Sequence, residues 1–177
     1  EYLRRLPRTT LDAAFRERLA TAGLAPEELP PGRWEAILEQ MIPRTKVLGE
    51  VPGNCAFFFT EDYVFDPRAV ERRLRPAGVP ALLEEAAAAF ETLPEFTAES
   101  SEAALRNIGE RRGAGLGALV HPLRVAVSGS GEGPGLFEML ALLGRERVCA
   151  RLRRVAARLR AGEPLAPADD ETRTTPR

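Results

Sequence analysis

The sequence predicts an all-α protein that consists of two small helical bundles in tandem. Ala, Leu, Glu and Arg dominate the composition and favour helices, whereas aromatic residues make up only 6% of the chain. Apolar residues recur at intervals of three and four along most of the sequence, as on the buried face of a helix. No segment alternates convincingly as a strand does, although residues 123–127 could be a strand on alternation alone.

Residues 1–60 are predicted to form the first bundle. Thr10 can cap a helix that runs to about Ala22, because its hydroxyl accepts a hydrogen bond from a free backbone N–H group. A second helix is expected to begin near Gly32 and to end or bend at Pro43, which lacks the N–H that a helix interior needs. Its apolar stripe is Trp34, Ile37, Leu38 and Met41.

The remainder of the first bundle is predicted to contain two short helical segments. One covers residues 44–50. Pro52 and Gly53 then favour a turn, and Asn54 could cap one further helical turn that ends at Phe58.

Residues 66–160 are predicted to form the second bundle, and start and stop signals mark its helices. Asp66 before a proline is typical of a helix start. An Ala-rich helix is expected over residues 80–93. Thr97 can cap the next helix, which should end before Gly113.

Two further helices are predicted near the end of this bundle. The first follows from the spacing of Leu136, Met139, Leu140 and Leu143. Pro134 suits its first turn, and Gly144 is placed to end it in a left-handed conformation. The second carries an apolar stripe beside a basic stripe of Arg147, Arg151, Arg154 and Arg158.

The positive charge is concentrated in the same region. Residues 121–160 contain eight Arg against three Glu, a net charge of +5, whereas the whole chain carries −1. A near-neutral chain with one basic module suits a local contact with a polyanion. Lys46 is the only lysine, and Arg is well suited to phosphate recognition. A GC-rich genome would also enrich Arg and is the simpler explanation.

Five aromatic residues cluster around the boundary between the bundles, namely Phe57, Phe58, Phe59, Tyr63 and Phe65. Such a cluster could stack nucleobases. More often it belongs to a core or a domain junction, and we expect that role here. Glu61 and Asp62 beside it are expected to cap or pair at the junction rather than to act as an acid–base pair.

The ends of the chain and its cysteines bound the other possibilities. Residues 161–177 lack apolar periodicity and are predicted to be a disordered tail. The first residue is Glu rather than Met, which suggests a fragment of a longer chain.

Cys55 and Cys149 are expected to be buried free thiols, with no metal site. No membrane span or signal peptide is visible, so we expect a cytoplasmic protein.

Three motifs occur in order, Pro-Leu-Arg-Val-Ala-Val-Ser-Gly-Ser at 122–130, Pro-Gly-Leu-Phe-Glu at 134–138 and Leu-Leu-Gly-Arg-Glu-Arg at 142–147. Upstream lie Met-Ile-Pro-Arg at 41–44 and Phe-Phe-Thr-Glu-Asp-Tyr at 58–63. Together they resemble the C-terminal anticodon-binding region of bacterial glutamyl-tRNA synthetases, which are class I enzymes. The resemblance covers roughly residues 1–160 and implies that residues 123–127 are helical.

The resemblance implies that Arg44 reads the third anticodon base. A planar guanidinium can donate to O2 and N3 of cytosine but meets a donor at N1 of guanine. Anticodons for Glu end in C and those for Gln end in G, so one arginine can discriminate between them. Without the resemblance, Arg44 would be an ordinary surface arginine after a helix end.

The other implied contacts lie in the second bundle. Arg124 matches the family arginine that contacts the anticodon bases. The turn that meets the first anticodon base corresponds to Gly133, Pro134, Gly135 and Leu136. The family commonly has Thr where Gly133 stands, so a hydroxyl contact is lost there and backbone contacts remain. The basic stripe predicts that Arg147 and Arg151 contact phosphates.

The implied function is to dock tRNA-Glu and check its anticodon for ATP-dependent glutamylation by an N-terminal catalytic domain. No HIGH-type or KMSKS-type signature is present, so ATP and Mg²⁺ are expected in that domain and no cofactor here. His121, the only histidine, has no nucleophile beside it, so catalysis by this chain alone is not expected. A monomer with no DNA partner is expected. The alternatives are a free-standing tRNA-binding or adaptor domain and a helical interaction domain that binds no RNA.

Overall fold

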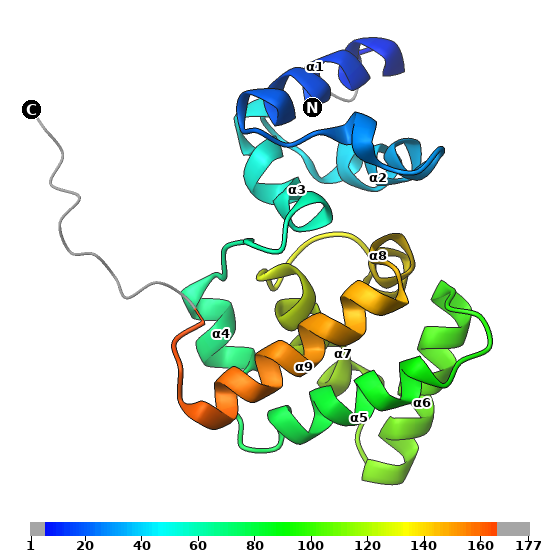
Figure 1. Ribbon diagram of the computed structural model, residues 1–177, viewed down its shortest axis with the longest axis vertical. Coiled ribbons are helices and arrows are strands. Elements are labelled where there is room, and N and C mark those ends of the chain that lie inside the picture. The colour runs from blue at the N-terminus through cyan, green and yellow to red at the C-terminus, as the bar shows by residue number, and fades with distance from the viewer. Residues whose placement is uncertain (1–5, 166–177) are drawn as a thin grey trace, which may run out of the picture.

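The structure is a computed structural model that describes residues 6–165, and these consist of helices and loops with no strand among them (Figure 1). The prediction of an all-α fold is confirmed. The α-helices are α1 (Arg8–Thr21), α2 (Arg33–Met41), α3 (Val51–Phe59), α4 (Pro67–Arg73), α5 (Val79–Glu91), α6 (Ala98–Arg112), α7 (Leu116–Ser128), α8 (Leu136–Leu143) and α9 (Arg145–Ala161). The short 3-10 helices are η2 (Pro26–Glu28), η3 (Ile42–Arg44) and η4 (Leu48–Glu50).

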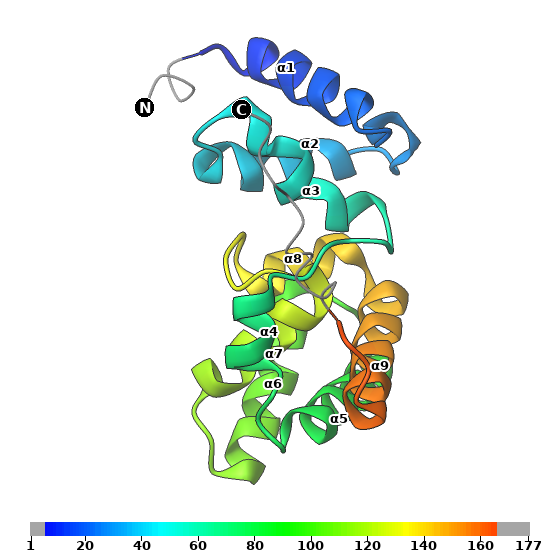
Figure 2. The same ribbon diagram turned by 90° about the vertical axis from the view of Figure 1, so that its left-hand side faces the viewer.

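The helices form two bundles, which Figure 2 shows stacked end to end. In the first, α1 packs against α3; in the second, α5 lies along α9, and α7 contacts both. The bundles meet where α2 contacts α8, and their buried apolar residues form one continuous cluster. The domain limits at residues 60 and 66 stay predictions.

Three helix boundaries agree with their predicted capping signals. The Asp66 side chain accepts a hydrogen bond from the Arg68 N–H at 2.9 Å, at the start of α4. Thr97 and Ser100 form a reciprocal capping box at the start of α6. Gly113 ends α6 in the left-handed conformation, with φ 62°.

The first bundle departs from the prediction in three places. Its first helix begins at Arg8 after a proline, ahead of Thr10. The helix predicted over residues 44–50 is replaced by the 3-10 turns η3 and η4. Pro52 and Gly53 lie inside the first turn of α3, because a proline there sacrifices no helix hydrogen bond.

The second bundle departs from the prediction at Pro134 and Gly144, whereas residues 123–127 are helical, as the resemblance implies. Residues 123–127 belong to α7 and are not a strand, and residues 125–127 are all buried because α7 is enclosed by the other helices. Pro134 precedes α8, which begins at Leu136. Gly144 has φ 87° and ψ 153°, so it is not left-handed helical, and α9 begins directly after it.

The aromatic cluster forms core rather than a surface for nucleobases. The buried members are Phe57, Phe58, Tyr63 and Phe65. Phe59 is partly buried and packs against Trp34, with ring centroids 6.4 Å apart. The four buried rings therefore belong to the core, as expected.

The end of the second bundle extends further than predicted. Gly162 ends α9, and the chain packs back so that Leu165 is buried, while residues 166–177 of the predicted tail lie outside the described residues. Cys55 and Cys149 are free and buried, as predicted, and burial raises the pKa of the Cys55 thiol to about 12. Between residues 6 and 165, no helix combines the length and hydrophobicity of a membrane span.

Candidate functional site

A cleft of about 490 Å³ lies where the two bundles meet, between η3, the first turn of α3 and the loop from α7 to α8. Its volume is typical of ligand sites. Its polar side chains are those of Arg44, Lys46, Asn54, Asp66, Ser128, Ser130 and Glu132. The cleft therefore combines hydrogen-bond donors with acceptors, as recognition of a base edge requires.

Arg44 reaches across this cleft from the first bundle. It is the last residue of η3, its Nε donates to the Gly133 carbonyl at 3.1 Å, and its Nη1 donates to the Gln40 carbonyl at 2.6 Å. A guanidinium has more N–H groups than these two bonds use. Because the side chain is exposed, Arg44 is both oriented by the protein and able to donate to a ligand.

Arg124 approaches the same turn from the second bundle. It lies on α7, is half-buried, and donates through Nη1 to the Pro134 carbonyl. Burial lowers the pKa of Arg124, and the charge of Arg44 lowers it further, against the opposing effect of Glu138. The two arginines are thus within electrostatic reach, and an anion or a base acceptor between them would relieve their repulsion.

The turn next to the two arginines presents backbone rather than side chains. Gly133 is exposed and has φ 139°, which favours glycine. Pro134 is buried, and Leu136 packs into the core with 3% of its surface exposed. The Glu138 carboxylate folds back over half-buried Gly135. The four predicted residues therefore lie together, but the Leu136 side chain is not available to a base.

Lys46, Asn54 and Val64 also line the cleft, although no motif pointed to them. Lys46 follows Arg44 by two residues and is the only lysine, which was a usable signal for a second positive charge. Asn54 was expected to cap a helix and instead lies exposed in α3. Val64 lies in the linker between the bundles, residues 60–66, with 78% of its surface exposed, and nothing in its sequence context marks it.

Arg151 is fully buried, so the prediction that it contacts phosphate is wrong. Its Nε and Nη2 donate to the two carboxylate oxygens of Glu61, at 3.0 and 2.7 Å. Its Nη1 and Nη2 also donate to the backbone carbonyls of Phe57, Thr60 and Val127. This part of the basic stripe faces the linker between the bundles rather than solvent.

The Glu61 carboxylate pairs with three arginines of α9 at the junction between the bundles, as predicted. It lies 3.0 Å from Arg147, 2.7 Å from Arg151 and 3.3 Å from Arg154. Burial alone would raise the pKa of Glu61, but Arg151 and then Arg147 overcome this effect and lower the pKa from 4.5 to about 2. Arg147 keeps 35% of its side chain exposed, and its phosphate contact stays a prediction.

The pH dependence of stability should report this pairing. Because the folded-state pKa of Glu61 is depressed, its stabilising contribution is complete above about pH 4.5 and is lost as the pH falls towards about 2. Wild type should therefore exceed Glu61→Gln in the free energy of unfolding at neutral pH, and the two should converge at low pH. Urea titrations at several pH values measure this difference, and a difference that does not change with pH would contradict the pairing.

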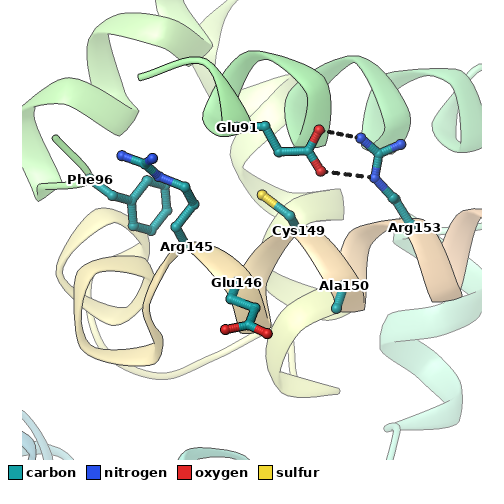
Figure 3. A pocket seen from close by; sticks show the side chains of 7 residues that line it. All are labelled: Glu91, Phe96, Arg145, Glu146, Cys149, Ala150 and Arg153. Carbon is teal, nitrogen blue, oxygen red and sulfur yellow. Dashed lines mark hydrogen bonds and ion pairs between the residues drawn. The ribbon is translucent and has the colours of Figure 1, made fainter. Parts of the chain in front are cut away.

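A second pocket, of about 600 Å³, lies between α5 and α9 (Figure 3). Arg153 there pairs with Glu91 at 2.6 Å, and the Cys149 thiol donates to the Ala87 carbonyl at 3.6 Å. Arg145 Nε is the only buried side-chain nitrogen or oxygen without a hydrogen-bond partner among residues 6–165. Because Glu91 and Arg153 pair with each other, these two side chains are less available to a ligand than the exposed Arg44 of the cleft.

Sequence comparison identifies a single family over most of the chain. Residues 11–156 match the family model described as anticodon binding domain. The glutamate–tRNA ligase of Moorella thermoacetica is 39% identical over 145 residues, which cover 80% of this chain and 30% of that ligase. The glutamate–tRNA ligase of Thermus thermophilus is 44% identical over 120 residues, which cover 68% of this chain and 25% of that ligase.

Solved structures share the fold. The crystal structure of a glutamate–tRNA ligase from Elizabethkingia meningosepticum matches with a TM-score of 0.75 and 23% identity, covering 89% of this chain and 30% of that one. At this identity the likeness concerns the fold alone. The chain thus spans about 25–30% of the length of these ligases.

Proposed function

The chain belongs to the anticodon binding domain family, and from that premise we propose that it docks the anticodon loop of tRNA-Glu within a glutamate–tRNA ligase. The convergence of Arg44 and Arg124 on the Gly133–Pro134 turn carries this proposal. Three splayed anticodon bases need donors at their edges and positive charge near their phosphates. Both are present at this cleft.

The cleft and the adjoining turn with Arg124 each have a role in this proposal. The free N–H groups of Arg44 donate to O2 and N3 of a cytosine at the third anticodon position, whereas guanine would present a donor to them. Arg124 contacts the anticodon bases, and the backbone at Gly133 and Gly135 meets the first base. Lys46, which lines the cleft together with Arg44, supplies positive charge for a phosphate.

In this proposal, aminoacylation is catalysed by other parts of the ligase. Glutamate activation with ATP and Mg²⁺ takes place in an N-terminal catalytic domain, and the present residues position the tRNA for it. The ligase would act as a monomer in the cytoplasm, where tRNA is aminoacylated.

Binding of RNA stem-loops tests the proposal. The chain should bind a stem-loop with the Glu anticodon more tightly than one with an unrelated anticodon, by about 1–3 kcal/mol for each mismatched base that it reads. The affinity should fall linearly with log salt concentration. Equal binding of both stem-loops would reduce the chain to a general RNA platform, and no binding at low salt by a folded chain would contradict the proposal.

A further inference from the structure

The end of α4 carries two arginines that no acidic side chain neutralises within residues 6–165. Arg72 and Arg73 lie in the last turn of α4, and neither side chain forms an ion pair or hydrogen bond there. Most exposed arginines of α9 are paired, as Arg153 is with Glu91 at 2.6 Å. An unpaired guanidinium retains all its donors for a phosphate.

These two arginines line a groove of about 430 Å³ between α4, the start of α5 and α7. Arg112 lines it as well but is paired with Glu85 at 2.7 Å. The other lining residues carry no charge. The unpaired charge of the groove is therefore entirely positive.

Helix α7 connects this groove with the cleft. α4 packs against α7, and Figure 2 shows both helices close to the loop that leads into α8. Pro122 of α7 lines the groove, and Ser128 at the end of the same helix lines the cleft. Burial lowers the pKa of His121, and the charges of Arg73, Arg124 and Arg72 lower it further. Positive potential therefore extends from Arg124 to the end of α4.

We infer that Arg72 and Arg73 bind phosphates of the RNA strand whose bases are read at the cleft. The inference rests on the proposed function. A strand that splays its bases into the cleft must carry its backbone past the protein surface, where unpaired cations can bind its phosphates. The α9 stripe offers fewer unpaired cations, because Arg151 is buried and Arg147 and Arg154 are paired with Glu61.

The salt dependence of RNA binding tests the inference. Neutralising both residues in Arg72→Gln/Arg73→Gln should reduce the slope of log affinity against log salt by about 1.4, since each lost contact to single-stranded RNA removes roughly 0.7. The preference for the Glu anticodon should not change, because neither residue reads a base. Arg72→Lys/Arg73→Lys keeps the charge and should retain the wild-type slope.

Arg153→Gln/Arg160→Gln is the matched control, because it removes the same charge from arginines paired with Glu91 and Glu84. Its slope should equal that of wild type. Circular dichroism and thermal unfolding establish that each variant is folded. An unchanged slope in Arg72→Gln/Arg73→Gln, with the anticodon preference intact, would overturn this inference and leave the proposed function standing. A slope in the control that falls as far as in Arg72→Gln/Arg73→Gln would do the same. Failure of wild type to bind would overturn the proposed function and this inference together.

Discussion

Replacing Arg151 by Met is expected to lower the free energy of unfolding by roughly 3–5 kcal/mol, because it removes a buried charged donor that satisfies several backbone carbonyls and pairs with the half-exposed Glu61 carboxylate. The guanidinium is fully buried and bridges α9 to the linker through Glu61. Its loss leaves three backbone carbonyls short of a donor, those of Phe57, Thr60 and Val127. Each unsatisfied buried group costs about 1–3 kcal/mol.

Arg153→Met is the matched control for this prediction. Arg153 lies on the same helix and also forms a two-bond pair with a glutamate, but both partners are about half exposed. Its replacement should cost less than about 1 kcal/mol. Urea titrations followed by circular dichroism measure both values. Equal losses in the two variants would show that the burial of Arg151 makes no special contribution.

Gly129→Ala is expected to lower the free energy of unfolding by roughly 2–5 kcal/mol, from backbone strain and overlap combined. Gly129 ends α7 with φ 76°, and an added Cβ would overlap the Val64 carbonyl oxygen. The Gly129 carbonyl also accepts a hydrogen bond from the Asp66 N–H at 2.8 Å. The substitution would therefore push the linker away from α7 and distort the loop that lines the cleft.

Gly113→Ala is the control that separates the cost of backbone strain from the cost of atomic overlap. Gly113 ends α6 with φ 62°, and no atom lies within 4 Å of an added Cβ. Its replacement should cost only the left-handed penalty of about 1–2 kcal/mol. Thermal and urea unfolding of both variants give the difference. If Gly129→Ala costs no more than Gly113→Ala, the linker does not rest on α7 as the structure describes.

The helices could be predicted from the sequence where the signal was local. Thr97 and Asp66 cap their helices through bonds to residues three and two positions away, so a short window contains the whole cause. Pro52 and Gly53 were misread, because the same residue types favour both a turn and the first turn of a helix. Residues 123–127 needed the resemblance, since a fully enclosed helix and a buried strand share an apolar pattern.

The site was only partly predictable, because its contacts join residues far apart in the chain. The motifs identified Arg44 and Arg124 separately, but only the fold brings both side chains to the Gly133–Pro134 turn. Arg44 and Gly133 lie 89 residues apart in the chain. The basic stripe of α9 was misread because periodicity marks a face without showing what covers it. Glu61 and the linker cover that face at Arg151, whereas Arg72 and Arg73 form no ion pair within residues 6–165.

The preference for cytosine over guanine at the third anticodon position tests the central claim most directly. The measurement compares the affinity of wild type and of Arg44→Ala for tRNA-Glu and for its C-to-G variant. Wild type should prefer cytosine by about 1–3 kcal/mol, the discrimination of one good bidentate base contact, and Arg44→Ala should lose that preference while remaining folded. A folded Arg44→Ala chain that keeps the full preference would contradict the assignment of base reading to Arg44.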